Sequence, residues 1–150
     1  MNRRQEAVLK HLDVDTIRMD NLRIVKYLEA LENASTSYAL WFKAEKSKKS
    51  DEFDSKFVDM QITVARSSFC MFVQVACEQI IRLDAVSKDV YLKDFDNLRN
   101  IAALRNFISH SYDAVKDSYL HRFMNRLSKS LTPLLMEMKK DYTTILRELE

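Results

Sequence analysis

Glycine is absent from this 150-residue chain, and proline occurs once, at Pro133. Because glycine supplies the tight turns of phosphate-binding loops, its absence excludes a Walker A loop and a Rossmann dinucleotide fingerprint. Glycine C-caps are excluded as well, and few residues remain that would break a helix. The chain is instead rich in leucine, alanine, methionine, lysine, glutamate and arginine, which predicts an all-α protein.

An excess of one charge and long apolar runs are also missing. The formal net charge is +2, so charge alone does not predict a nucleic-acid partner. The longest apolar run, residues 69–76, is too short to span a bilayer, and no membrane association is expected. The chain has three histidines and no Cys/His cluster, so we predict neither a metal site nor another cofactor.

The two cysteines, Cys70 and Cys77, lie in one apolar stretch. On a helix they would be about 10 Å apart along the axis, which is too far for a disulfide. We therefore expect two buried, reduced thiols, as is usual in a cytoplasmic protein.

The length is ordinary for one domain, and we expect residues 1–150 to form a single bundle of five to six helices. Apolar residues at helical spacing predict a long helix that Asp15 caps, and another from about residue 50 to Leu83. The polar stretch 43–54 is expected to be an inter-helix loop or a frayed helix end. Shorter helices are expected within 84–94, from about 94 to 108, over 115–127 and over 134–149.

The second long helix is expected to be the most buried. Its apolar face is predicted to include Phe53, Phe57, Met60 and Val64. Residues 69–76 are apolar nearly all round, which is typical of a helix at the centre of a bundle. At the start of the last helix, Thr132 followed by Pro133 reads as an N-cap with proline at the first helical position.

Side chains suited to phosphate chemistry gather in the segment 104–112, directly after an apolar run. Helical spacing arranges them in two stripes roughly 100° apart: Arg105, Ser109 and Tyr112 in one, and Asn106, His110 and Asp113 in the other. A guanidinium binds phosphate oxygens through two parallel hydrogen bonds, and an imidazole transfers protons near neutral pH. Arg105 and His110 are therefore candidate catalytic residues.

RNA is a suitable substrate for this pair because it carries its own nucleophile, the ribose 2′-hydroxyl. Asn106 or Asp113 is placed to hold the His110 imidazole and select its tautomer, and Ser109 supports the Arg105 stripe. The alternative is a solvated arginine and a satisfied polar histidine on an ordinary amphipathic helix.

The order of Arg105, His110 and Tyr112 resembles the Arg-x4-His-x-Tyr signature of the HEPN superfamily, and specifically of its HepT-like toxin branch. Asn106 matches the asparagine that commonly follows the arginine. Residues 76–79, Ala-Cys-Glu-Gln, keep only the acid of the family's Ile-Gly-Glu-Ala-like segment. The family's tryptophan shortly before the motif is absent.

The resemblance covers roughly residues 65–135 and implies a HEPN-like homodimer. The implied activity is that of a metal-independent endoribonuclease toxin, with Arg105 and His110 catalytic at a dimer cleft. The implied partner is a nucleotidyltransferase antitoxin, which neutralises the toxin by AMPylation of the motif tyrosine, here Tyr112. The alternative is a non-catalytic helical partner or substrate-binding subunit of a nucleotidyltransferase. Retention of both Arg105 and His110 favours the ribonuclease.

A second basic feature follows the motif. Arg122, Arg126 and Lys129 recur at i, i+4 and i+7, which places them on one face of a helix. This stripe is a candidate RNA-binding surface, and a solvated helix face is the alternative.

Overall fold

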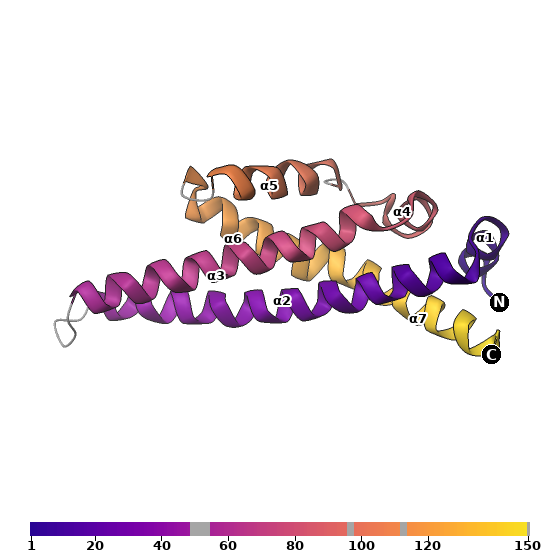
Figure 1. Ribbon diagram of the computed structural model, residues 1–150, viewed down its shortest axis with the longest axis horizontal. Helices are drawn as coiled ribbons and strands as arrows, with labels where there is room; N and C mark the ends of the chain where they lie inside the picture. The colour runs from indigo at the N-terminus through magenta and orange to yellow at the C-terminus, as the bar shows by residue number, and fades with distance from the viewer. Residues whose placement is uncertain (49–54, 96–97, 112–113, 150) are drawn as a thin grey trace.

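The computed structural model describes residues 1–48, 55–95, 98–111 and 114–149. These residues form helices and their connections and contain no strand, which confirms the all-α prediction (Figure 1). The helices are α1 (Arg3–His11), α2 (Val14–Lys48), α3 (Ser55–Arg82), α4 (Ala85–Leu92), α5 (Leu98–Ser111), α6 (Asp117–Arg126), the π-helical segment η2 (Leu127–Leu131) and α7 (Thr132–Glu148).

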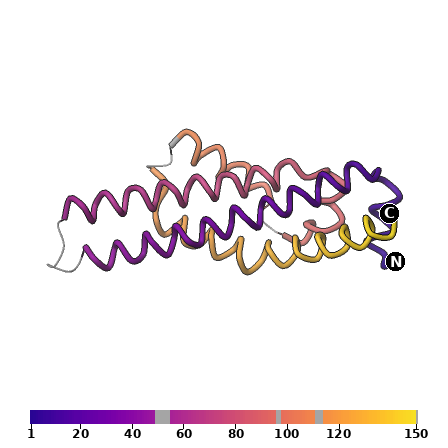
Figure 2. The backbone as a smooth tube through the Cα atoms, turned by 60° about the horizontal axis from the view of Figure 1, so that its bottom comes forward, coloured from indigo at the N-terminus to yellow at the C-terminus, as the bar shows by residue number. Residues whose placement is uncertain are grey.

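A long hairpin of α2 and α3 forms the spine of the molecule (Figure 1). Helix α7 packs along α2, and α5 packs along α3. Helices α1, α4 and α7 contact one another at the end where both chain termini lie (Figure 2). At the opposite end, the tip of the hairpin projects beyond the other helices.

Helix α2 is longer than predicted at both ends. Its cap is Asp13 rather than Asp15, because the Asp13 carboxylate accepts a hydrogen bond from the Thr16 backbone N–H at 2.7 Å. That bond lowers the pKa of Asp13. Asp15 lies in the first turn and pairs with Arg18 at 3.1 Å. Aspartate is a strong cap at either position, so the sequence pattern does not choose between them.

The polar stretch 43–54 is not simply a connection, because α2 continues through it to Lys48. Lysine, alanine and glutamate favour helices, and Ala44 is buried, so residues 43–48 extend the helix. The predicted start of the next helix near residue 50, and Phe53, lie outside the described residues.

The predicted apolar face of α3 is wrong over its first half. Phe57, Met60 and Val64 are 52%, 58% and 59% exposed, whereas Val58 is 2% exposed. Here α3 belongs to the projecting tip and has α2 as its neighbour, so only one narrow side is covered (Figure 1). Apolar periodicity identified a stripe, but none of the helices in the described part of the chain covers it.

The central part of α3 is buried on one side only. Phe69 and Val73 are in the core as predicted, but Met71 and Val75 are 53% and 40% exposed. Residues 69–76 are therefore not buried all round. We call Met60, Val64, Met71 and Val75 the exposed α3 stripe, since their spacing places them along one face of the helix.

The expected N-cap at Thr132 is also wrong. Helix α6 passes into α7 through η2, and the Thr132 hydroxyl donates back to the Leu127 carbonyl at 2.7 Å. The Tyr27 hydroxyl lies 3.0 Å from the same hydroxyl. Pro133 follows immediately, and its ring would clash with the carbonyl four residues earlier in a regular α-helix. A wider π-turn relieves that clash without ending the helix.

Buried apolar side chains form one core cluster with members from all the helices named above. Cys70 and Cys77 belong to it and form no disulfide, as predicted. Burial raises the pKa of the Cys77 thiol to about 12. Within the described ranges, no helix has the length and apolar character that crossing a membrane requires.

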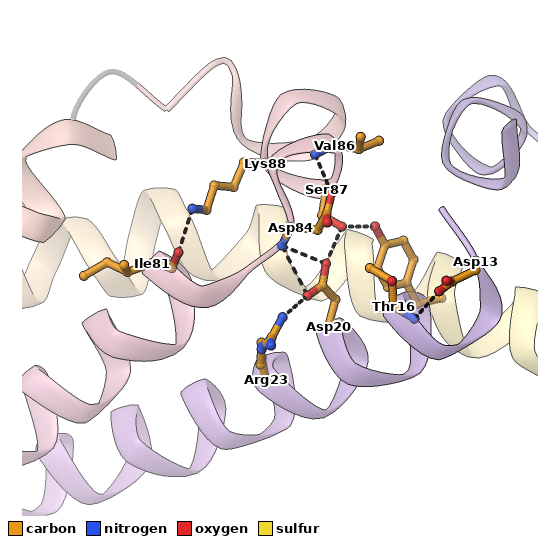
Figure 3. A network of polar contacts seen from close by, with 10 residues as sticks. Asp13, Thr16, Asp20, Arg23, Ile81, Asp84, Val86, Ser87 and Lys88 are labelled. Atoms are coloured by element: carbon orange, nitrogen blue, oxygen red, sulfur yellow. Dashed lines mark hydrogen bonds and ion pairs between the residues drawn. The ribbon is translucent and has the colours of Figure 1, made fainter. Parts of the chain in front are cut away.

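A buried carboxylate joins α2 to α4. Asp20 is fully buried and pairs with Arg23 Nη1 at 2.7 Å. It also accepts hydrogen bonds from the Asp84 backbone N–H at 3.1 Å and the Ser87 hydroxyl at 2.6 Å (Figure 3). The Ser87 hydroxyl is in turn 2.5 Å from the Tyr142 hydroxyl of α7. Asp20 thereby fixes the junction of three helices.

A second buried carboxylate, Asp141, joins both ends of the chain. It accepts hydrogen bonds from Gln5 Nε2 at 3.1 Å and Asn2 Nδ2 at 3.3 Å. The Tyr91 hydroxyl donates to its other oxygen at 2.7 Å. Asn2 and Gln5 also cap α1 reciprocally, so one cluster holds α1, α4 and α7 together.

Candidate functional site

The motif segment lies on α5, which is amphipathic. Ile101, Leu104 and Ile108 recur at spacings of three and four residues and are all buried. Burial of this face fixes the rotation of α5 against the bundle and turns the opposite face to solvent. The polar residues of the motif therefore lie along the border with α3 or on the open face.

Two polar pairs join α5 to α3 beside this apolar contact. Arg105 Nε lies 3.0 Å from Glu78 Oε1, and Gln74 Nε2 donates to Ser109 Oγ at 2.7 Å. Each helix contributes residues four apart, which lie one turn from each other. The two pairs therefore set the register between the helices as well as their orientation.

Glu78 holds Arg105 in place. One carboxylate oxygen faces Arg105, and the other lies 3.2 Å from Arg82 Nη2. The Arg105 Nε–H does not point at the carboxylate, so the contact is an ion pair without an aligned hydrogen bond. The Arg105 side chain is 32% exposed, and its terminal nitrogens make no hydrogen bond to a described residue.

His110 and Asn106 lie one turn apart on the open face of α5, and both are exposed. Neither forms a hydrogen bond or ion pair with another described residue. Helical geometry separates Arg105 from His110 by about 7.5 Å along the axis and roughly 140° around it. One α5 helix therefore presents the cation and the imidazole on different sides.

Tyr112 and Asp113 lie outside the described residues, so their predicted roles stay predictions. The chain is described again from Ala114, and Arg66 of α3 holds this region. Arg66 Nη2 donates to the Val115 carbonyl at 2.5 Å, and its Nε pairs with Asp117 at 2.9 Å. Sequence reasoning missed Arg66, since a single arginine in a long helix gives no signal.

The predicted basic stripe is divided. Arg122 and Arg126 are exposed on α6, whereas Lys129 lies in η2, where the wider turn changes the angle between successive residues. The two arginines line a pocket of about 180 Å³ that α5 helps to form. Lys129 is not among its lining residues.

Two hollows flank the exposed α3 stripe. One, of about 630 Å³, lies between α2 and α3 beside Met60 and Val64. The other, of about 340 Å³, lies between α3 and α5 beside Met71 and Ser109. Phe107 of α5 is 49% exposed. Apolar surface thus runs along α3 and reappears on the motif helix.

Comparison with protein-family models, curated proteins and solved structures finds no match to the chain. Among the residues that the structure describes, no group of three or more His, Cys, Asp or Glu side chains is placed to hold a metal ion.

Proposed function

We propose that the chain is a metal-independent endoribonuclease of the HepT-like toxin kind, with Arg105 and His110 as its catalytic residues. The ion pair between Glu78 and Arg105 carries the proposal. Arg105 belongs to the motif, and Glu78 is the one residue that segment 76–79 keeps of the family's upstream pattern. The fold brings Arg105 Nε to 3.0 Å from Glu78 Oε1. Both residues were identified from the sequence, independently of this contact.

In the proposed reaction, the 2′-hydroxyl of the RNA attacks the adjacent phosphate of the same strand. A base removes the proton of the ribose 2′-hydroxyl, the 2′-oxygen forms a bond to phosphorus, and the 5′-oxygen leaves with a proton from an acid. The products are a 2′,3′-cyclic phosphate and a free 5′-hydroxyl. His110 serves in proton transfer, worth about 10²–10⁴-fold in rate. Arg105, held by Glu78, stabilises the charge that develops on the phosphate oxygens.

The proposal includes a homodimer, because one chain provides one such histidine. A second copy that packs two-fold symmetrically on the exposed α3 stripe and Phe107 would cover apolar surface and bring in a second His110. A stable interface of this kind buries more than about 1,000 Å². The shared cleft would also bring the cation of one chain and the imidazole of the other to one phosphate.

Control by a nucleotidyltransferase belongs to the same proposal. Tyr112 follows Arg105 by two helical turns on one stripe of the sequence pattern. A nucleotide attached to its hydroxyl would place an anion near the guanidinium, where it would compete with the RNA phosphate. An antitoxin that AMPylates Tyr112 would thereby block the cleft.

The test is cleavage of end-labelled RNA in the presence of a metal chelator. We expect His110→Ala and Arg105→Ala each to lower the cleavage rate by about 10²-fold or more without unfolding the protein, as circular dichroism would show. The melting temperature should stay unchanged in His110→Ala and fall slightly in Arg105→Ala, which loses its ion pair with Glu78. His11→Ala and Arg147→Ala are matched controls, since both residues are exposed and neither lies on the motif helix. Cleavage that persists in His110→Ala would rule out the proposed mechanism.

A folded wild-type chain that binds RNA or a nucleotidyltransferase without cleaving RNA would instead support the non-catalytic alternative. Sedimentation of the same samples tests the dimer. Met71→Glu places a charge on the exposed α3 stripe and should produce monomers with little activity. The exposed Met19→Glu is its control on α2. An active wild-type monomer at micromolar concentration would contradict the shared cleft.

A further inference from the structure

The pocket that Arg122 and Arg126 line opens between the beginning of α5 and α6. Its volume is about 180 Å³, and its lining residues are Phe95, Asn100, Tyr119, Arg122, Phe123 and Arg126. Asn100 and His110 lie at opposite ends of α5, about 15 Å apart along the helix axis. The pocket is therefore separate from the motif, but the two share one helix.

An aromatic platform forms one side of this pocket. Tyr119 is 41% exposed, while Phe123, one turn further along α6, is 7% exposed and belongs to the core. Their ring centroids are 6.5 Å apart and their planes differ by 22°. Phe123 is thus held by the core and supports the Tyr119 ring, which presents a flat surface at the pocket. Such a surface suits the stacking of a nucleobase.

The polar lining has the complementary chemistry for the rest of a nucleotide. Arg122 and Arg126 are exposed and lie one turn apart, and none of the described lining residues is acidic. A guanidinium recognises phosphate oxygens in a bidentate manner. The Asn100 amide offers both a donor and an acceptor to the edge of a base. Asn100 and Arg126 each take part in a further interaction within the protein.

We propose that this pocket binds one nucleotide unit of the RNA strand, with its base stacked on Tyr119 and its phosphate bound by Arg122. The volume is below the roughly 300–1,000 Å³ of pockets for drug-sized ligands, which suits a single ring and not a longer segment. This assignment rests on the proposed ribonuclease function. The strand would then run along α5 from the pocket to His110, and the pocket would hold a nucleotide a short distance from the cleaved bond.

The experiment measures binding of a fluorescent, fully 2′-O-methylated oligoribonucleotide, which cannot be cleaved by 2′-hydroxyl attack. Tyr119→Ala should weaken binding by about 10-fold or more, and Tyr119→Phe should bind like the wild type because it keeps the ring. Arg122→Ala should lower the slope of log K against log salt by about 0.7. Arg147→Ala, which removes an exposed arginine of α7, should change neither quantity.

A second titration uses AMP, because a free nucleotide has the same ring and phosphate. If Tyr119→Ala weakens binding of AMP but leaves binding of the oligonucleotide unaltered, the assignment to an RNA strand would be overturned. The assignment would also be overturned if the wild type did not detectably bind the oligonucleotide, or if Tyr119→Ala and Arg122→Ala both bound it as tightly as the wild type does. These residues would then be a solvated helix face.

The two proposals fail in different ways. If the wild type binds the oligonucleotide through Tyr119 but does not cleave RNA, the pocket stands and the ribonuclease proposal falls. If His110→Ala abolishes cleavage while Tyr119→Ala binds like the wild type, the ribonuclease stands and the pocket assignment falls. Circular dichroism of each variant confirms that it is folded, which the exposure of Tyr119 and Arg122 leads us to expect.

Discussion

Removal of the Asp20 carboxylate should destabilise the whole bundle. Asp20 is fully buried in α2 and receives hydrogen bonds from Arg23, the Asp84 backbone N–H and the Ser87 hydroxyl (Figure 3). Asp20→Ala leaves all three donors without their acceptor. It also leaves the partly buried Arg23 guanidinium without its counter-charge.

The expected loss is about 3–5 kcal/mol in the free energy of unfolding, which is the usual result of removing one partner of a buried ion pair. Hydrogen bonds to a charged group contribute about 1.5–3 kcal/mol each, and their effects overlap here because they share one carboxylate. For a chain of this size, such a loss lowers Tm by roughly 10 °C. Asp20→Asn should cost less, since one carbonyl oxygen still accepts.

The assay is urea denaturation followed by circular dichroism, with Asp15→Ala as the matched control. Asp15 pairs with Arg18 on the same helix and at the same i,i+3 spacing, but both side chains are largely exposed. The same substitution there should leave the unfolding free energy nearly unchanged. If Asp20→Ala unfolds at the same urea concentration as Asp15→Ala, the buried network contributes no net stability and the reasoning is wrong.

Two further predictions concern pH and control. Burial raises the pKa of Tyr27 and Tyr142 above the ordinary value of 10.0. Both hydroxyls therefore lose their protons more readily in the unfolded chain at alkaline pH, and the free energy of unfolding should fall above about pH 10. The fall is at most about 1.4 kcal/mol per pH unit for each tyrosine. Urea titrations at about pH 8 and 11 measure this fall, and equal stability at both would contradict it. If the proposed control by a nucleotidyltransferase is right, mass spectrometry of the chain co-expressed with such an enzyme should locate an AMP adduct on Tyr112. Neutralisation that persists in Tyr112→Phe would show inhibition by binding alone.

Periodicity predicted which segments are helical better than it predicted what covers them. Ile101, Leu104 and Ile108 form the buried face of α5 as their spacing indicates. The same kind of spacing at Met60 and Val64 marks a face that stays open. Burial depends on a second element lying alongside, and that element comes from a distant part of the chain. A local pattern contains no information about it.

The polar partners of the candidate site were predicted only in part. Glu78 was singled out as the acid that residues 76–79 share with the family's segment, but its pairing with Arg105 depends on the register between α3 and α5. The hydrogen bond between Gln74 and Ser109 depends on the same register. Tyr119 was missed as a pocket residue because Asn100, on the other wall, lies on another helix.

The cluster around Asp141 constrains when the protein can finish folding. Gln5 and Asp141 are separated by 136 residues, yet their side chains share a buried hydrogen bond. During synthesis, the Asn2 and Gln5 side chains therefore lack their Asp141 acceptor until α7 has emerged, whereas the α2–α3 hairpin can form earlier. Contacts of such large sequence separation form slowly. Docking of α1 onto α7 is thus expected to follow formation of the hairpin, and this end of the bundle would stay incomplete until α7 has been made.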